Sequence, residues 1–309
     1  MRLFFSIYLG TLMLFFSNCQ SKKPQIQKTI FEPEHISTRL IEYSATFSPS
    51  GKEIYFSRSN DQWGKGNMKS SIYFAIKQNQ KWSKPKLVSF SGQYDDSAPY
   101  LADGGRTLYF ISKRPSKEVQ QISMDIWKVE RIKDNDWGIP VRLNNPINSA
   151  ENEYCLRADK HGNLYFASDR KGGYGQGDLY IAEKANNTYK PPVSLGNVLN
   201  SETGEWNLEV NKNGDVIIFE ASDKPQNLSA YGDLYISFKS NDIWSIPQNI
   251  IEINTTGSDL YPELIEDKNI LYFSSSDSLE STQTNIYSVT FGTIFDKYKK
   301  SAVFKTKEK

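Results

Sequence analysis

Histidine and cysteine are scarce in this chain of 309 residues, and neither sign of charge is in excess. The two histidines, His35 and His161, are too few for a histidine-rich metal site or a pair of catalytic histidines. The two cysteines, Cys19 and Cys155, cannot form a disulfide framework. Thirty-seven basic and 36 acidic residues leave a formal charge of +1, so nucleic acid is not an expected partner. No metal and no cofactor is expected.

Long apolar runs are also rare, and the prominent one lies at the N-terminus. Residues 3–16 are apolar with few interruptions, too short to span a bilayer comfortably, and Cys19 and a polar stretch follow. This arrangement resembles a bacterial lipoprotein signal, which implies a signal peptide at residues 1–18 and a lipidated Cys19. Residues 19–28 are then a tether to the membrane. An ordinary signal peptide or an uncleaved anchor is the alternative. Cys155 is predicted to be a small buried residue.

The sequence shows no apolar period of 3.6 residues over a helical length, but it does repeat. A short apolar segment that ends in phenylalanine recurs at steps of 54, 56, 53 and 54 residues. Its closing residues are Phe56, Phe110, Phe166, Phe219 and Phe273. This segment is the first of three sequence markers that recur in register and together predict an array of five units.

The second marker is an aromatic residue after a branched aliphatic one, and the third is an aromatic residue three positions before a proline. The second marker ends at Tyr73, Trp127, Tyr180, Tyr235 and Tyr287. The third is formed by Trp82, Trp137, Tyr189 and Trp244 with Pro85, Pro140, Pro192 and Pro247. Each unit reads as four short antiparallel strands, with the proline near the outer edge. The predicted fold is an all-β, five-bladed β-propeller over residues 29–295.

The two ends of the array complement each other. The fifth unit lacks the aromatic–proline marker, and residues 29–38 match the tail of the other units. We therefore expect Ile30 and Phe31 to form the outer strand of the last blade, which closes the ring without a disulfide. Residues 296–309 are predicted to be a charged C-terminal tail.

Two stretches resemble the TolB-type, WD-like (PD40) propeller repeat of bacterial envelope proteins. They are residues 99–104 (PYLADG), followed by LYF at 108–110, and residues 167–175 (ASDRKGGYG), followed by DLY at 178–180. The form with Trp-Ser-x-Pro and Ile-Asn-Ser looks like that of Bacteroidota lipoproteins. The resemblance covers about residues 29–291 and implies a β-propeller in the cell envelope.

One acidic residue precedes the innermost strand of every unit. These residues are Glu42, Asp96, Glu153, Glu205 and Asp259. Equivalent positions in a propeller lie at one radius, so the five acids are expected to form a ring near the central tunnel. The ring is a candidate binding site for a cation or a basic group, or a source of two carboxylates for glycan hydrolysis. Its structural alternative is that each acid accepts backbone N–H bonds between blades. Repetition in every blade favours that alternative.

Three arginines, Arg58, Arg114 and Arg170, follow the second strand of the first three units. They are candidates for binding an anionic glycan, and solvated charges at strand ends are the alternative. No Gly-x-Ser-x-Gly elbow occurs, so no catalytic residue is assigned. The glycine-rich loop at 172–177 lacks the strand-to-helix context of a phosphate loop, so no nucleotide is expected.

Two classes of function follow from these patterns. The first is a non-enzymatic propeller, held at a membrane through its lipid anchor, that binds or scaffolds a protein or glycan in the bacterial cell envelope. The alternative is an envelope glycan-processing enzyme, a glycosidase or lyase, that uses the acidic mouth of the tunnel. Lys22 and Lys23 stand where an acidic export stretch would lie, so we expect the outer membrane, facing the periplasm.

Overall fold

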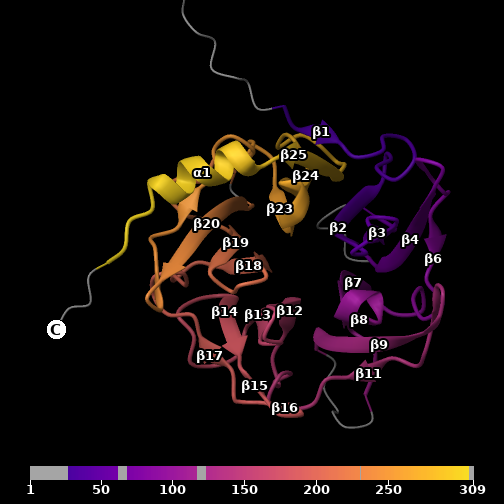
Figure 1. Cartoon of the computed structure of the whole chain (residues 1–309), viewed down its shortest axis with the longest axis horizontal. Helices are drawn as coiled ribbons and strands as arrows, with labels where there is room; N and C mark the ends of the chain where they lie inside the picture. The colour runs from indigo at the N-terminus through magenta and orange to yellow at the C-terminus, as the bar shows by residue number, and fades with distance from the viewer. Residues whose placement is uncertain (1–26, 62–67, 117–122, 230, 306–309) are drawn as a thin grey trace, which may run out of the picture.

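The computed structural model describes residues 27–61, 68–116, 123–229 and 231–305. It arranges them as five small antiparallel sheets around a central axis, so the predicted five-bladed β-propeller is confirmed (Figure 1). The innermost strands are β2 (Ile41–Phe47), β7 (Asp96–Ala102), β12 (Glu153–Ala158), β18 (Glu205–Val210) and β23 (Asp259–Ile265). The second strands are β3 (Glu53–Ser59), β8 (Thr107–Ser112), β13 (Leu164–Ser168), β19 (Val216–Ala221) and β24 (Ile270–Ser275). The third strands are β4 (Ser70–Gln78), β9 (Asp125–Lys133), β14 (Asp178–Ala182), β20 (Asp233–Ser240) and β25 (Asn285–Thr290).

The first two sequence markers face each other in every blade. The closing phenylalanine of the second strand lies directly opposite the aromatic residue of the third strand. In blade 1, for example, Phe56 pairs with Tyr73, and their rings stack with centres 6.2 Å apart. All five phenylalanines are almost fully buried. Aromatic pairs across neighbouring strands stabilise a sheet, so this repeated pair fixes the register of each blade.

The outer strand is shorter and more broken than the sequence predicts. In blades 1, 2 and 4 the proline divides it into two pieces of two residues, because proline cannot donate a ladder hydrogen bond. These pieces are β5 (Lys81–Trp82) and β6 (Lys86–Leu87), β10 (Asp136–Trp137) and β11 (Val141–Arg142), and β21 (Ile243–Trp244) and β22 (Gln248–Asn249). In blade 3, β17 (Val193–Ser194) pairs with β14, while β15 (Lys184–Ala185) and β16 (Thr188–Tyr189) form a separate hairpin.

The N-terminal segment completes blade 5, as predicted. Strand β1 (Thr29–Ile30) pairs antiparallel with β25, and the backbone N–H of Phe31 donates to Ile286. The Phe31 ring then packs edge-on against Phe47, Trp82 and Tyr272 from both sides of the seam between blades 5 and 1. The ring is therefore closed by strand pairing and by an aromatic cluster.

One helix follows the last strand, in the region where the sequence predicts a charged tail. Helix α1 (Gly292–Lys300) packs Ile294 and Tyr298 onto the core of blades 4 and 5 (Figure 1). The expectation of a tail from residue 296 is therefore wrong up to Lys300, because the lysines of this stretch mask a short apolar face. In the described part of the chain, no helix has the length and apolar character needed to cross a membrane.

Candidate functional site

The five ring acids are the first or second residues of the innermost strands, and the structure buries all of their side chains completely. In blades 1, 3, 4 and 5 the carboxylate accepts both the backbone N–H and the hydroxyl of a serine or threonine four residues earlier. In blade 2, Asp96 accepts hydrogen bonds from the Ser91 and Ser112 hydroxyls instead. Apart from Ser112 in β8, these donors lie on the segment that leads into the innermost strand. The contacts support the structural interpretation of the ring, since no carboxylate faces open solvent.

The three candidate arginines lie against the first three of these acids. Arg58 contacts Glu42 at 2.9 Å, Arg114 contacts Asp96 at 2.7 Å and Arg170 contacts Glu153 at 3.2 Å. Lys224, which the sequence patterns did not single out, contacts Glu205 at 2.8 Å. Each base also lies over the aromatic residue of the third strand, which adds a cation–π contact. We call this arrangement the acid–base–aromatic unit.

Blade 5 builds a related arrangement with a residue from the other end of the chain. Asp277 follows β24 at the place where the other blades carry their base. Lys28, just before β1, contacts Asp277 at 2.9 Å and lies 4.8 Å from the centre of the Tyr287 ring. Its charge acts on Asp259 through space. Burial still raises the pKa of Asp259 to about 6.

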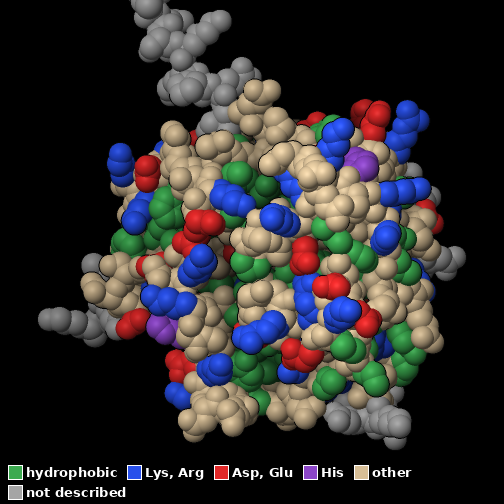
Figure 2. Space-filling model, turned by 45° about the vertical axis from the view of Figure 1, so that its right-hand side comes forward, with side chains coloured by type: hydrophobic (Ala, Val, Ile, Leu, Met, Phe, Trp, Pro, Cys, Tyr) green, Lys and Arg blue, Asp and Glu red, His purple; other side chains and the backbone are tan. Residues whose placement is uncertain are grey.

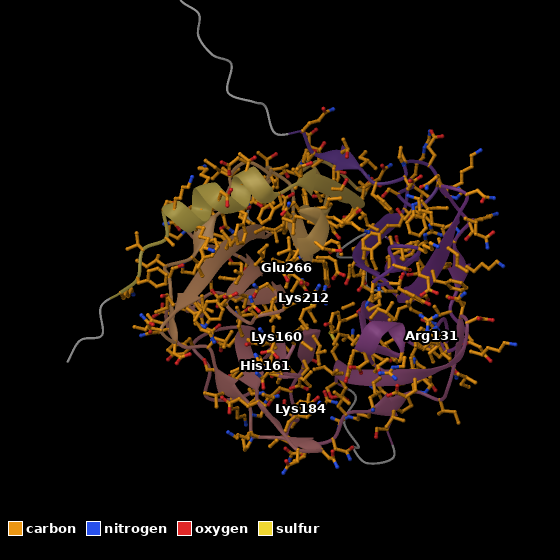
Figure 3. All side chains as sticks on the ribbon, viewed as in Figure 1. Arg131, Lys160, His161, Lys184, Lys212 and Glu266 are labelled. Carbon is orange, nitrogen blue, oxygen red and sulfur yellow. The ribbon has the colours of Figure 1, made fainter. Side chains whose placement is uncertain are left out.

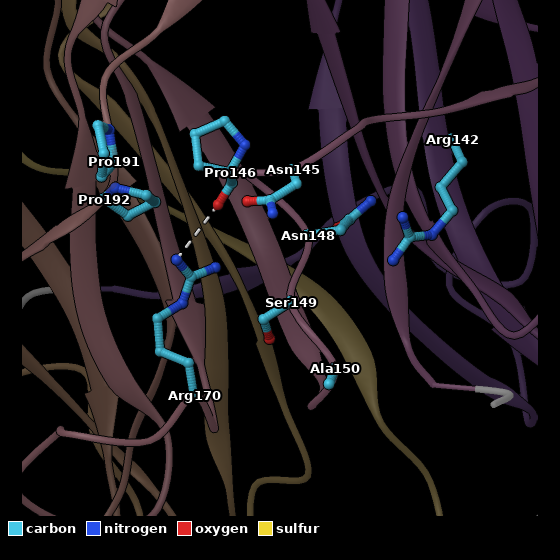
Figure 4. A pocket seen from close by; sticks show the side chains of 9 residues that line it. All are labelled: Arg142, Asn145, Pro146, Asn148, Ser149, Ala150, Arg170, Pro191 and Pro192. Atoms are coloured by element: carbon cyan, nitrogen blue, oxygen red, sulfur yellow. Dashed lines mark hydrogen bonds between the residues drawn. The ribbon is translucent and has the colours of Figure 1, made fainter. Parts of the chain in front are cut away.

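The arginines are consequently committed to the fold. Arg170 lines an open pocket of about 540 Å³ together with Arg142, Pro146 and Pro192 (Figure 4). Its guanidinium donates to the backbone carbonyls of Pro146 and Ile147 and to Glu153. Arg142 is held by two hydrogen bonds to Asp125. Neither guanidinium is left as a free cation for an anionic ligand.

The tunnel behind the ring is closed by side chains. The residues four positions after the ring acids, one from each innermost strand, contact one another around the axis. These residues are Thr46, Tyr100, Arg157, Glu209 and Glu263.

Arg157 is 1% exposed and bridges the axis. It donates a 2.6 Å hydrogen bond to Glu209, lies 3.2 Å from Glu263 and packs over the Tyr100 ring. Thr46 donates to Glu263. Burial raises the pKa of Glu209 to about 8 and raises that of Glu263, although Arg157 opposes both shifts.

The layer between the ring acids and this cluster has an unusual backbone. Each innermost strand contains a β-bulge at this level. Four of the five residues in the layer have positive φ, namely Ser44, Ala98, Asn207 and Tyr261. The fifth, Cys155, is buried as predicted, and burial raises the pKa of its thiol to about 11. Cys19 lies outside the described residues.

The face on which the innermost strands end carries a mixed set of charges. The turns of blades 3, 4 and 5 are joined there by hydrogen bonds from Lys160 to the Lys212 carbonyl and from the Lys212 N–H to Glu266 (Figure 3). On the face shown in Figure 2, positive and negative side chains are interspersed. That surface presents no continuous area of one sign.

The opposite face, on which the innermost strands begin, contains a pocket of about 560 Å³ between blades 4 and 5. Its polar lining includes Asn207 of β18, Glu220 of β19 and the hydroxyls of Ser258 and Ser276. Tyr261 forms an aromatic wall, and Tyr231 and Leu279 are 66% and 59% exposed at the pocket. We call this space the blade 4–5 pocket.

Glu220 is the one carboxylate among the residues that line the blade 4–5 pocket. It is 94% buried, and among the described residues Asn207 is its one hydrogen-bond donor, at Oε2. A Cβ atom at Gly232 would lie 2.8 Å from Oε1, so only glycine leaves room for the carboxyl group there. Burial raises the pKa of Glu220 to about 8, and the nearby Asp259 adds to the shift.

Together, the closed ring of five sheets, the filled tunnel and a pocket at one seam define the chain as a β-propeller with a blocked channel. No protein-family model and no curated protein matches its sequence. Solved structures do match its fold. The catalytic domain of a GH62 α-L-arabinofuranosidase from Coprinopsis cinerea is 12% identical with a TM-score of 0.51, over 82% of this chain and 91% of that one.

Two further structures are less similar. The α-L-arabinofuranosidase PaAbf62A from Podospora anserina is 9% identical, with a TM-score of 0.48 over 81% of this chain and 90% of that chain. A puromycin-hydrolyzing peptidase from Mycobacterium tuberculosis is 12% identical, with a TM-score of 0.43 over 76% of this chain. The chain spans 34% of the length of that peptidase. At these identities the likeness shows the fold alone.

Proposed function

We propose that the chain is a non-enzymatic β-propeller that is tethered to a bacterial membrane through Cys19 and binds a glycan or protein in the cell envelope. The main support for a non-enzymatic role is that the ring acids are buried and make their contacts within the fold. Glu209 and Glu263 are likewise buried beside Arg157. Carboxylates in such contacts are not available to a substrate.

A glycosidase, the hydrolytic form of the alternative, needs two carboxyl groups that both reach the substrate. The blade 4–5 pocket offers Glu220 as its single carboxylate, which suits binding better than hydrolysis. A hydrolysis assay with polysaccharides and peptidoglycan separates the two functions. The proposal expects no product above background, and product formation that disappears in Glu220→Gln would establish the enzyme instead.

The tether places the pocket near the membrane in this proposal. Lys28 contacts Asp277, which stands between the pocket residues Ser276 and Ser278, so the described chain begins beside the pocket. Eight residues separate Cys19 from Lys28, and a fully extended chain of this length reaches at most about 30 Å. The resemblance of the repeats to TolB-type propellers supports the same location, the outer membrane facing the periplasm.

Anchoring is tested by Cys19→Ser, which should release the protein from membranes or leave its precursor unprocessed. Unchanged processing and retention would refute the lipid anchor. The periplasmic orientation is tested by protease treatment of intact cells, which should leave the protein whole. Digestion of the protein before lysis would place it on the cell surface.

A further inference from the structure

At the blade 4–5 pocket, one residue of the second strand differs in kind from its equivalents in the other four blades. Glu220 occupies a position of the second strand that holds Ser57, Ile111, Ala167 and Ser274 in the other blades. In blades 1 and 5 this serine is used inside the fold, since its oxygen accepts the backbone N–H of Ala98 or Ser44 in the next blade. A large acidic residue at this position in one blade alone is not required by the architecture.

We propose that the blade 4–5 pocket holds one uncharged sugar unit, which Glu220 and Asn207 hydrogen-bond and which packs against the ring of Tyr231. This assignment rests on the proposed binding function and names the chemical class of its ligand. The volume of the pocket, about 560 Å³, lies within the usual range for a site that binds a small molecule.

The lining of the pocket matches a polyhydroxylated ligand. It combines one carboxyl and one amide group with several serine and threonine hydroxyls, which can both donate and accept. The exposed ring of Tyr231 offers an apolar face beside them, as the C–H face of a sugar requires. The Oε1 atom of Glu220 has no donor among the described residues, so it is available to a ligand hydroxyl.

The charges around the pocket argue against a charged ligand. Among the described residues that line it there is no lysine, arginine or histidine, so a uronate or a phosphorylated sugar would meet no positive partner there. Three titratable groups from neighbouring elements face Glu220, namely Asp259 and Tyr261 of β23 and Tyr231 before β20. Burial raises the pKa of Glu220 to about 8, which favours the uncharged carboxyl group at neutral pH, a form that can donate a hydrogen bond to a ligand.

The test measures binding of the full chain in detergent to an array of neutral, anionic and amino-sugar glycans, followed by calorimetric titration of the strongest neutral one. Neutral glycans should bind more strongly than their anionic and amino counterparts. Glu220→Ala should weaken binding about tenfold, because it removes a hydrogen bond to the sugar. The conservative Glu220→Gln, an uncharged group of the same shape that can still donate, should recover most of that loss. Tyr231→Ala should weaken binding about tenfold. Glu202→Gln, an exposed acid outside the pocket, is the matched control and should bind as the wild type does.

Binding by the wild type should also weaken as the pH rises above about 8, where Glu220 loses its proton, and Glu220→Gln should remove that dependence. No retained neutral glycan, or equal binding by Tyr231→Ala in a folded variant, would overturn the assignment. Loss of binding in a folded Glu220→Gln would point to an amine ligand and overturn it as well. Glycan that is bound and then cleaved would refute the non-enzymatic function instead, whereas an inert, membrane-bound protein without glycan affinity would refute this assignment alone.

Discussion

The Nζ atom of Lys28 lies 4.8 Å from the centre of the Tyr287 ring, although 258 residues separate the two along the chain. Four blades take the base of their acid–base–aromatic unit from their own sequence. In the fifth blade, the base over the aromatic residue comes from the segment that closes the ring. Closure is therefore both a strand pairing and an electrostatic contact.

Deletion of residues 20–34 should destabilise the propeller strongly. The change removes β1 and the Phe31 ring, which exposes the edge of β25 and the aromatic surface of Phe47 and Tyr272. We expect a loss of about 3 kcal/mol and a fall in Tm of about 10 °C. Calorimetry checks this, with a deletion of residues 20–26 as the control that leaves β1 in place. Equal melting of both variants would contradict closure by the N-terminal strand.

Lys28→Ala should have a smaller effect of about 1 kcal/mol, because it removes a cation–π contact and a partly exposed ion pair. The loss of its positive charge should also raise the pKa of Asp259 further. Chemical denaturation measures the first effect. Lys81→Ala, on the exposed face of β5, is the control and should be neutral. A variant as stable as the wild type would show that the contacts of Lys28 in blade 5 contribute nothing to the free energy of unfolding.

Arg157→Met should destabilise the protein by about 3–5 kcal/mol at pH 8, because it leaves Glu209 and Glu263 buried without their cation. Their pKa values then rise further, so stability should be retained at low pH and lost as the pH increases. Adding Glu209→Gln and Glu263→Gln to this variant should recover much of the loss at pH 8. Unfolding curves at pH 5 and pH 8 test both statements, and equal destabilisation at the two pH values would count against them.

Stability of the wild type should fall between about pH 4.5 and pH 8, partly through Glu220. A carboxyl group whose folded pKa is raised contributes stability while it is protonated and loses that contribution as the pH rises through the folded value, here about 8. Glu220→Gln should flatten this slope, whereas Glu202→Gln should not. Denaturant midpoints across the pH range measure this slope. Parallel profiles for the wild type and Glu220→Gln would show that Glu220 does not cause the pH dependence of stability.

The first two repeat markers predicted the fold because each of them performs the same structural task in all five blades. Phe56 and Tyr73, for instance, pair in register, and their equivalents do so in every blade. The split of the outer strand at Pro85 was missed because a proline marks the edge of a sheet without saying whether pairing resumes beyond it. Helix α1 was missed because its apolar face covers few residues between lysines.

The candidate site was predictable only where it repeats. Glu42 and its equivalents stood out as a series, but their pairing with Arg58 and the other bases depends on how strands lie side by side. Lys224 and Lys28 complete the series from places with no shared spacing. Glu220 occurs once, so a search for repeats passes over it. A large acidic residue where other units carry serine, alanine or isoleucine was the signal available.

The closure has a consequence for the order of folding. Strand β1 is made first, yet its partner β25 lies 259 residues later, for example in the contact between Thr29 and Ser288. The first residues of the ring must therefore remain unpaired until almost the entire chain has been synthesised. Contacts between such distant residues slow folding. Blades 1 to 4 can form one after another, but the propeller closes only when β25 is available to pair with β1.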